Sequence, residues 1–160
     1  MRPTFKYKNQ DVKAGGILFF VRNREKKFYL LRKHKNWSDI GGKTEPTDND
    51  ILDTIVREVV EETNNVLLDP SHNKQQATEA LRKLLDETPI LEIFYNKGAK
   101  YVMLKVELPE HLYYMDNKRF GKTEETTNQD HYFSWINIVV REKLHPRLRF
   151  HLNYKNIFTI

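Results

Sequence analysis

The chain has 160 residues, of which 39% are hydrophobic and 12% aromatic, so we interpret residues 1–160 as a single globular domain with one core. The formal net charge of +5 favours an anionic partner such as a nucleotide, a polyphosphate or RNA, although a basic surface that only keeps the protein soluble would give the same value. Because there is no cysteine and no long apolar run, disulfides, thiolate sites and membrane spans are excluded, and we expect a soluble cytoplasmic protein.

The first quarter of the chain predicts strands. Residues 5–7 suit a short edge strand, and the apolar, β-branched and aromatic run at 14–21 predicts a buried strand. A turn at 23–26 leads to a partner strand at 27–32, so the two form a hairpin. Three positive side chains follow, Arg32, Lys33 and Lys35. They are either solvated loop charges or groups that meet substrate phosphates.

Gly41 and Gly42 predict a turn, because paired glycines permit backbone conformations that side chains forbid. A helix is expected next, beginning at Asp48 or Asp50, which are suitable N-caps, and ending at Thr63. At about 100° per residue the apolar side chains fall on one broad arc of this helix. They are Leu52, Ile55, Val56, Val59 and Val60.

Glu58, Glu61 and Glu62 fall together on the opposite side of the same helix. Such a cluster is either a solvated helix face or a group of hard oxygen ligands suited to Mg²⁺ or Mn²⁺. The glycine pair upstream lies at a distance that lets the chain fold back over the cluster. We therefore favour a metal site.

At these residues the chain resembles the Nudix hydrolases. Gly42, five residues, Asp48 and then the run 57–62 (Arg-Glu-Val-Val-Glu-Glu) match the Nudix box, with four departures. Asp48 replaces a glutamate, and eight residues rather than seven separate it from Arg57; Asn64 replaces the closing glycine; and Ile40 replaces a frequent proline. Asn64 is a mild change, since asparagine tolerates the left-handed conformation at a helix end.

The resemblance implies roles for individual residues. Glu58, Glu61, Glu62 and the Gly41 carbonyl would hold Mg²⁺ or Mn²⁺. Glu62, Glu61 or a loop carboxylate such as Glu125 would act in catalysis, and Arg57 would orient a glutamate. The substrate phosphates and base would be met by the basic residues near the box and one loop aromatic: Arg32, Lys33, Lys35, Lys43 and Phe120.

Beyond the box the pattern alternates between strands and helices. A short strand is expected at 66–68, a loop at 69–73 and a second helix at 74–87, which has one apolar stripe and to which we assign no chemistry. Two strands at 89–95 and 100–106 are joined by a hairpin turn.

A long polar loop is expected at 109–130, and loops of this length are often functional. Its acidic pair, Glu124 and Glu125, is either a source of a metal ligand or base, or simply solvated. Its aromatic residues Tyr113, Tyr114 and Phe120 either stack on a base or anchor the loop. A last strand at 131–136 and two C-terminal helical segments complete the prediction.

The element order predicts an α+β fold, an α/β/α sandwich with a mixed β-sheet between helices, as in Nudix proteins. The resemblance implies a metal-dependent pyrophosphohydrolase. Its substrate would be a nucleoside diphosphate derivative or a capped RNA end, which would make it an mRNA decapping enzyme. The alternatives are a diphosphoinositol polyphosphate, a dinucleoside polyphosphate, or a Nudix module that binds nucleotide or RNA without cleaving it. The sequence does not define the oligomeric state.

Overall fold

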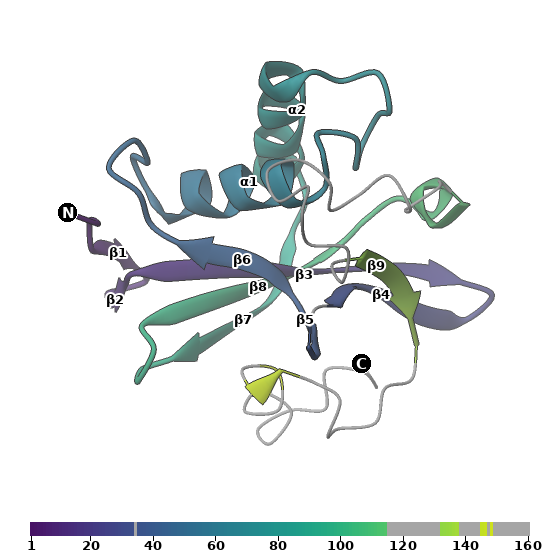
Figure 1. Ribbon diagram of the computed structural model, residues 1–160. Helices are drawn as coiled ribbons and strands as arrows, with labels where there is room; N and C mark the ends of the chain where they lie inside the picture. Colours follow the sequence, from purple (N-terminus) through teal and green to yellow (C-terminus); the bar gives the residue numbers. More distant parts are fainter. Residues whose placement is uncertain (34, 115–131, 138–144, 147, 149–160) are drawn as a thin grey trace.

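The computed structural model describes residues 1–33, 35–114, 132–137, 145, 146 and 148. These residues form a seven-stranded mixed sheet with two α-helices on one face, and a separate two-stranded hairpin beside it (Figure 1). The elements, in chain order, are β1 Phe5–Tyr7, β2 Gln10–Val12, β3 Ala14–Asn23, β4 Lys26–Lys33, β5 Trp37–Ser38, β6 Ile40–Lys43, α1 Ile51–Glu62, α2 Lys74–Glu87, β7 Ile90–Asn96, β8 Tyr101–Glu107, the 3₁₀ helix η1 Glu110–Tyr114, and β9 Tyr132–Ile136.

Strand β3 is the centre of the sheet. It pairs antiparallel with β4 and β6 and parallel with β8, while β5 and β9 pair with β4 and β7 pairs with β8. Residues 15–21 of β3 are all buried, as expected for a strand covered on both faces. The hairpin of β3 and β4, the hairpin of β7 and β8, and the last strand are therefore confirmed.

Helix α1 begins where the sequence predicts. The side chain of Asp50 caps its N-terminus by accepting a hydrogen bond from Asp53 N at 2.8 Å. After Thr63, Asn64 and Asn65 adopt left-handed conformations with φ of 58° and 65°. Asparagine is thus used where the Nudix pattern has glycine, and the chain turns away from the helix at this point.

Helix α2 packs against α1, and its buried side chains join the apolar cluster between the helices and the sheet. Asn73 and Gln76 form a capping box at its start, and its buried side chains are Ala77, Leu81 and Leu85. The boundaries of α2 coincide with the prediction.

The sheet separates two apolar clusters. Ile17, Phe19, Val102 and Leu104 belong to the larger one, between the sheet and the helices. The smaller cluster lies on the opposite face and includes Leu148. The described helices thus supply one outer layer of the expected sandwich, and the C-terminal helices predicted for the other layer lie outside the described residues, apart from 145, 146 and 148.

Two local predictions are wrong. Gly41 and Gly42 do not form a turn: they lie in β6, where Gly41 pairs with Gly16 and Gly42 with Gly15. Glycine is needed there because other groups approach the strand closely, as described below. Residues 66–68 form no strand, and Leu67 instead packs into the cluster beneath the helices.

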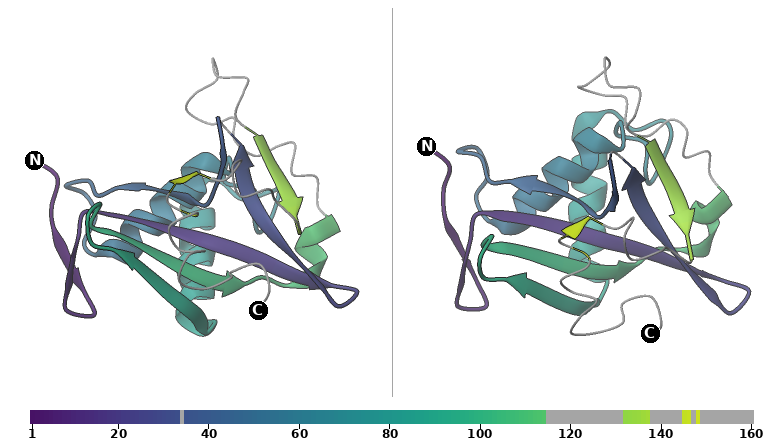
Figure 2. Two further views of the ribbon diagram at one scale, coloured as in Figure 1. Left: turned by 90° about the horizontal axis from the view of Figure 1, so that it is seen from below. Right: turned by 60° about the horizontal axis from the view of Figure 1, so that its bottom comes forward.

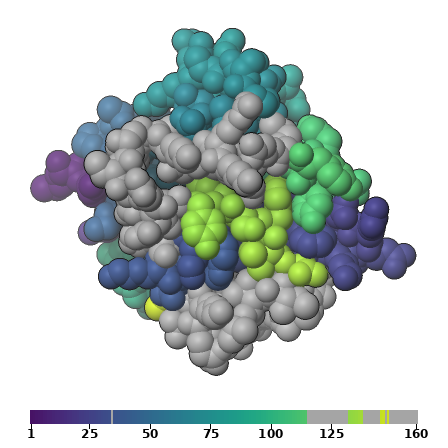
Figure 3. Space-filling view, turned by 45° about the vertical axis from the view of Figure 1, so that its right-hand side comes forward, coloured from purple at the N-terminus to yellow at the C-terminus, as the bar shows by residue number. Residues whose placement is uncertain are grey.

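The long loop starts with η1, which lies beside β9 at the surface (Figure 3). The ring of Tyr113 packs 4.8 Å from that of Phe28 and 6.0 Å from that of Trp135, measured between centroids. The Tyr114 hydroxyl accepts a hydrogen bond from Asn23 at 2.6 Å. Both tyrosines therefore hold η1 against β3, β4 and β9. Glu124, Glu125 and Phe120 lie outside the described residues.

Candidate active site

The three glutamates of α1 share one side of the helix and are not a solvated face. Only 15% of the Glu58 side chain, 22% of that of Glu61 and 11% of that of Glu62 is exposed. Burying carboxylates this far costs free energy unless cations or hydrogen-bond donors compensate. Within the described residues, two arginines supply part of this compensation.

Arg57 is the first of these. Its Nη1 lies 3.0 Å from Glu58 Oε1 and 3.7 Å from Glu61 Oε2. Its Nε donates to Asp48 Oδ1 at 3.1 Å and its Nη2 donates to Asp48 Oδ2 at 2.9 Å. Nη2 also donates to the carbonyl of Lys43 at 2.9 Å. One guanidinium therefore connects the loop after β6 to two of the three glutamates. Its contact with Asp48 has the bidentate geometry that arginine favours with carboxylates.

Asp48 is the anchor of this arrangement. Burial by itself raises the pKa of a carboxyl, but hydrogen bonds from Arg57, the Glu45 backbone and Thr54 outweigh burial and hold the pKa of Asp48 below its ordinary value. Burial opposes the charge of Arg57 too, but its interactions with Asp48 and Glu58 raise the guanidinium pKa overall. The pair is thus ionised. The one-residue insertion before Arg57 does not prevent Asp48 from reaching it.

Arg32 is the second arginine. It lies on β4, and its Nη1 is 3.5 Å from Glu62 Oε1. The sequence predicted that Arg32 meets substrate phosphates, yet here it contacts a glutamate of the box. The two residues are 30 positions apart, on a strand and a helix, so the contact could not be predicted from a local sequence pattern.

Gly42 provides the space in which Glu58 sits. A Cβ atom on Gly42 would lie 2.3 Å from Glu58 Oε1 and 2.4 Å from its carboxyl carbon. A Cβ on Gly41 would point to the other face and meet the Tyr101 hydroxyl at 2.3 Å. The glycine pair is therefore explained by close contacts on both faces of β6.

Three carboxylates are ligands that suit a hard divalent cation such as Mg²⁺ or Mn²⁺. Because Gly42 has no side chain, the carboxyl group of Glu58 lies close to β6. Within the described part of the chain, no three or more acidic or histidine side chains are gathered as a metal-binding group. The two arginines hold the carboxylates instead. The Gly41 carbonyl remains a predicted ligand.

The other predicted substrate-binding residues lie apart from one another. Lys33 places its Nζ 5.3 Å from the centroid of the Trp37 ring and donates to the carbonyl of Lys35 at 3.4 Å. Lys35 is exposed. Lys43 is exposed at the end of β6, next to Gly42. Only Arg32 among the four basic residues makes an ion pair with a box glutamate within the described chain.

A buried polar pair beneath β6 is missed by the sequence analysis. The hydroxyl of Tyr101 donates to Asp39 Oδ2 at 2.6 Å, and both residues are buried. A Cβ on Gly16 would meet this pair, at 2.4 Å from Asp39 Oδ2. The signal lay in the second glycine pair, Gly15 and Gly16, which faces Gly41 and Gly42 across the strands.

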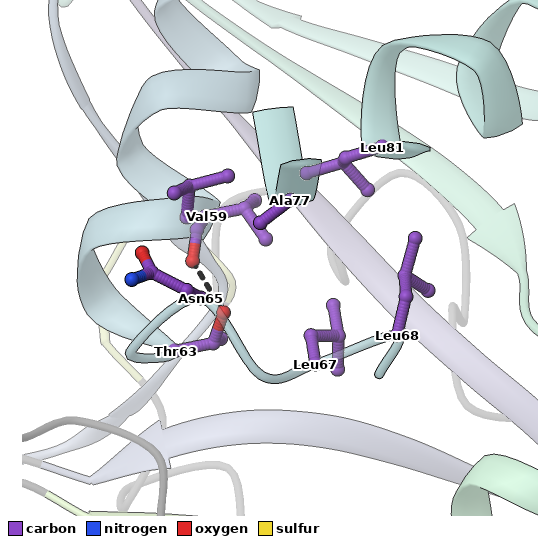
Figure 4. A pocket seen from close by; sticks show the side chains of 8 residues that line it. Val59, Thr63, Asn65, Leu67, Leu68, Ala77 and Leu81 are labelled. Atoms are coloured by element: carbon purple, nitrogen blue, oxygen red, sulfur yellow. Dashed lines mark hydrogen bonds between the residues drawn. The ribbon is translucent and has the colours of Figure 1, made fainter. Parts of the chain in front are cut away.

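The described residues of the two helices border a small cavity and an open groove. A cavity of about 10 Å³, roughly the room for one water, lies between α1 and α2 and is mostly apolar (Figure 4). In it the Thr63 hydroxyl donates to the Val59 carbonyl at 2.6 Å. An open groove of about 770 Å³ runs along the other side of the two helices, touching Asp48 and Arg57 but none of the three glutamates.

Comparison with known proteins identifies the family. The family model of the NUDIX domain matches residues 12–149. A crystal structure of an Ap4A hydrolase from C. elegans is 16% identical, with 91% of this chain and 97% of that chain covered and a TM-score of 0.48. A mutT/nudix family protein from Listeria innocua is 13% identical, with 88% of each chain covered and a TM-score of 0.50. A search of curated proteins gave no match.

The chain belongs to the Nudix hydrolases, the class of enzymes that act on phosphoric anhydride bonds. This conclusion rests on the family match over most of the chain, because likeness at such low identity shows the fold alone. Within the described residues, no helix is both long and apolar enough to cross a membrane.

Proposed function

We propose that this enzyme uses Mg²⁺ or Mn²⁺ to hydrolyse a diphosphate linkage in a nucleoside diphosphate derivative or at a capped RNA end. The observation that carries the proposal is the contact of Arg57 with Asp48, Glu58 and Glu61, which fixes carboxylates of the box on one side of α1. A cytoplasmic location suits such substrates.

Each side chain has a distinct part in the proposal. Glu58, Glu61 and Glu62 hold the divalent ion, which neutralises phosphate oxygens and makes water a better nucleophile when it is bound. Glu62 or Glu61 accepts the proton of the attacking water, and Arg32 keeps Glu62 in place. Arg57 positions the carboxylates without contacting substrate. Glu125 stays a predicted alternative base.

Lys43 stays a predicted contact for a substrate phosphate. It is exposed and its carbonyl accepts a hydrogen bond from Arg57, but side chains alternate along β6, so Lys43 shares the face of Ala14 rather than that of Gly42 and Glu58. Dinucleoside polyphosphates and diphosphoinositol polyphosphates present the same chemical group to these residues. We rank them second, because the formal net charge of +5 suits a longer anion such as a capped RNA.

The test is a panel of capped RNA, sugar nucleotides, dinucleoside polyphosphates and inositol pyrophosphates, incubated with Mg²⁺, with Mn²⁺ or with EDTA. We expect products with metal only. Glu61→Gln and Glu62→Gln should abolish turnover and keep the wild-type circular dichroism spectrum. If both variants retain full activity, or if no substrate is cleaved with either metal, the enzyme assignment fails and a binding module is the better description.

A further inference from the structure

Helix α2 makes a charged contact with the start of α1, which it crosses (Figures 1 and 2). Arg82, near the middle of α2, binds Asp50 with both ends of its guanidinium. Its Nη1 donates to Asp50 Oδ1 at 3.3 Å and its Nη2 donates to Asp50 Oδ2 at 3.2 Å. Nη1 also donates to Asp53 Oδ1 at 2.7 Å. One side chain of α2 thus holds the N-cap residue of α1 and an aspartate of its first turn.

The same two aspartates fix the loop that precedes α1. Asp50 Oδ1 accepts a hydrogen bond from Asp53 N, and Asp53 Oδ2 accepts one from Asn49 N at 2.9 Å. Burial by itself raises the pKa of Asp50, but hydrogen bonds from Arg82 and from the backbone outweigh burial and hold this pKa below its ordinary value. Asp50 is therefore ionised, and the backbone around it is tied to a charge that Arg82 holds in place.

Asp48 stands two residues before Asp50 in this loop. Its carboxylate is bound by Arg57, whereas that of Asp50 is bound by Arg82. The two arginines therefore hold the two ends of the segment 48–50. Both arginines, together with Asp48 and Asp53, line the open groove beside the helices, so the two charged clusters border the same space.

A second attachment of α2 to α1 is apolar and lies elsewhere. The side chain of Leu81 is buried and borders the small cavity together with Val59 and Val60, which belong to the second half of α1 (Figure 4). This packing joins the two helices independently of Arg82. The charged contact at the start of α1 can therefore be removed while the apolar contact stays.

We propose that Arg82 is a positioning residue for the glutamates of α1, and that it acts through the segment 48–50 and Arg57. The inference rests on the proposed function, in which these glutamates hold the divalent ion. Arg82 fixes Asp50 at one end of the segment. Asp48 at the other end holds Arg57, which contacts two of the three glutamates. Helix α2 thus contributes to the site, although its sequence pattern indicates only packing.

The affinity of the substrate-free protein for Mn²⁺ reports the position of the glutamates without any turnover. It is measured from the electron paramagnetic resonance signal of free Mn²⁺. The test variant is Arg82→Gln. Lys83→Gln, at a side chain that is 73% exposed, controls for the loss of one charge. Leu81→Ala controls for loosened packing between the helices, and thermal melting verifies that every variant folds.

Arg82→Gln should bind Mn²⁺ about threefold to tenfold more weakly. Partners that orient metal ligands directly change affinity by about 10-fold to 100-fold, and Arg82 stands one step further from the glutamates. Lys83→Gln and Leu81→Ala should keep the wild-type affinity, although Leu81→Ala melts at a lower temperature. In the Asp48→Asn background the Arg82 substitution should have no further effect, because Arg82 acts through Asp48.

Amide hydrogen exchange tests the loop without metal. The amide of Glu45 donates to Asp48 Oδ2 at 2.9 Å, so its exchange rate reports how firmly Asp48 is held. Arg82→Gln should speed this exchange by about tenfold, and Lys83→Gln should leave it unchanged. If the wild type binds no Mn²⁺, the proposed function fails, and the role of Arg82 is then decided by the exchange at Glu45 alone.

Three results would overturn the inference. The first is a wild-type Mn²⁺ affinity in Arg82→Gln or, where the wild type binds no Mn²⁺, an unchanged exchange rate at Glu45. The second is a loss of affinity in Leu81→Ala as large as that in Arg82→Gln, because α2 would then act through packing. The third is simple additivity of Arg82→Gln and Asp48→Asn, because the two residues would then act independently.

Discussion

Arg57 donates two hydrogen bonds to Asp48, at 3.1 Å and 2.9 Å, although the two residues are nine positions apart and on different elements. The same guanidinium contacts Glu58 and Glu61. The loop before α1 and the acidic side of α1 are therefore coupled through one side chain. A substitution of Asp48 should therefore alter the position of Arg57 and, through it, the positions of Glu58 and Glu61.

Asp48→Asn should lower both stability and activity. The side chain of Asp48 is only 4% exposed. Its hydrogen bonds to Arg57 join two charged groups, and such bonds each contribute about 2 kcal/mol to the free energy of unfolding. Urea unfolding measures the loss of stability. Asp69→Asn, at a loop position where the side chain is 49% exposed, is the control and should unfold close to the wild type. Equal stability of the two variants would contradict the anchoring role of Asp48.

The same variant should change the response to acid. Because the folded state holds the pKa of Asp48 below its ordinary value of 3.8, the unfolded state takes up the proton first as the pH falls. The contribution of Asp48 is thus present above that value and is lost as the pH falls through the folded pKa. Asp48→Asn should therefore lose less stability than the wild type over this acid range.

Gly42→Ala should reduce activity more than stability. The new methyl group would come within 2.3 Å of Glu58 Oε1, and the end of a glutamate side chain moves aside at little cost to the fold. Glu58 would then leave its place beside β6. Gly98→Ala is the matched control, since its Cβ meets nothing closer than 3.5 Å. We expect both variants to melt near the temperature of the wild type, and only Gly42→Ala to show a lower kcat/KM.

Much of this arrangement was accessible from the sequence, because the signals were local. The cap at Asp50, the apolar arc and the acidic side of α1 lie within one continuous segment, and periodicity alone defines them. The error at Gly41 and Gly42 has a physical cause: a glycine pair indicates either an unusual backbone angle or a close neighbour, and only the fold shows which. The contacts of Arg32 with Glu62 and of Tyr101 with Asp39 join distant segments, so they depend on strand register.

Arg32→Gln distinguishes two roles for this arginine. Because Arg32 lies 3.5 Å from Glu62, we expect its loss to lower kcat and leave KM nearly unchanged. Contact with substrate phosphates would instead raise KM. Lys26→Gln, at an exposed position at the start of β4, controls for the loss of one charge. Steady-state kinetics on a cleaved substrate from the panel separates the two roles, and a raised KM with normal kcat would restore the sequence-based role of phosphate binding.

Lys105 lies on the face of the sheet opposite α1, and its burial predicts a pH dependence of stability. Its side chain is only 1% exposed, and its Nζ lies 3.7 Å from Glu92 Oε1 and over the rings of Phe20 and Tyr29. Burial lowers the pKa of Lys105 to about 8, despite the opposing charge of Glu92. The folded state therefore releases this proton at a lower pH than the unfolded chain does.

Between pH 8 and 10 the unfolded chain holds a proton that folded Lys105 has lost, so the free energy of unfolding should rise with pH, by about 2 kcal/mol for a shift of this size. Lys105→Met keeps the length of the side chain and should abolish the rise, while Lys83→Met, on an exposed face of α2, should retain it. Guanidinium unfolding at a series of pH values measures the slope directly. A wild-type stability that stays flat or falls over this range would mean that Lys105 is charged in the folded protein at the same pH as in the unfolded chain.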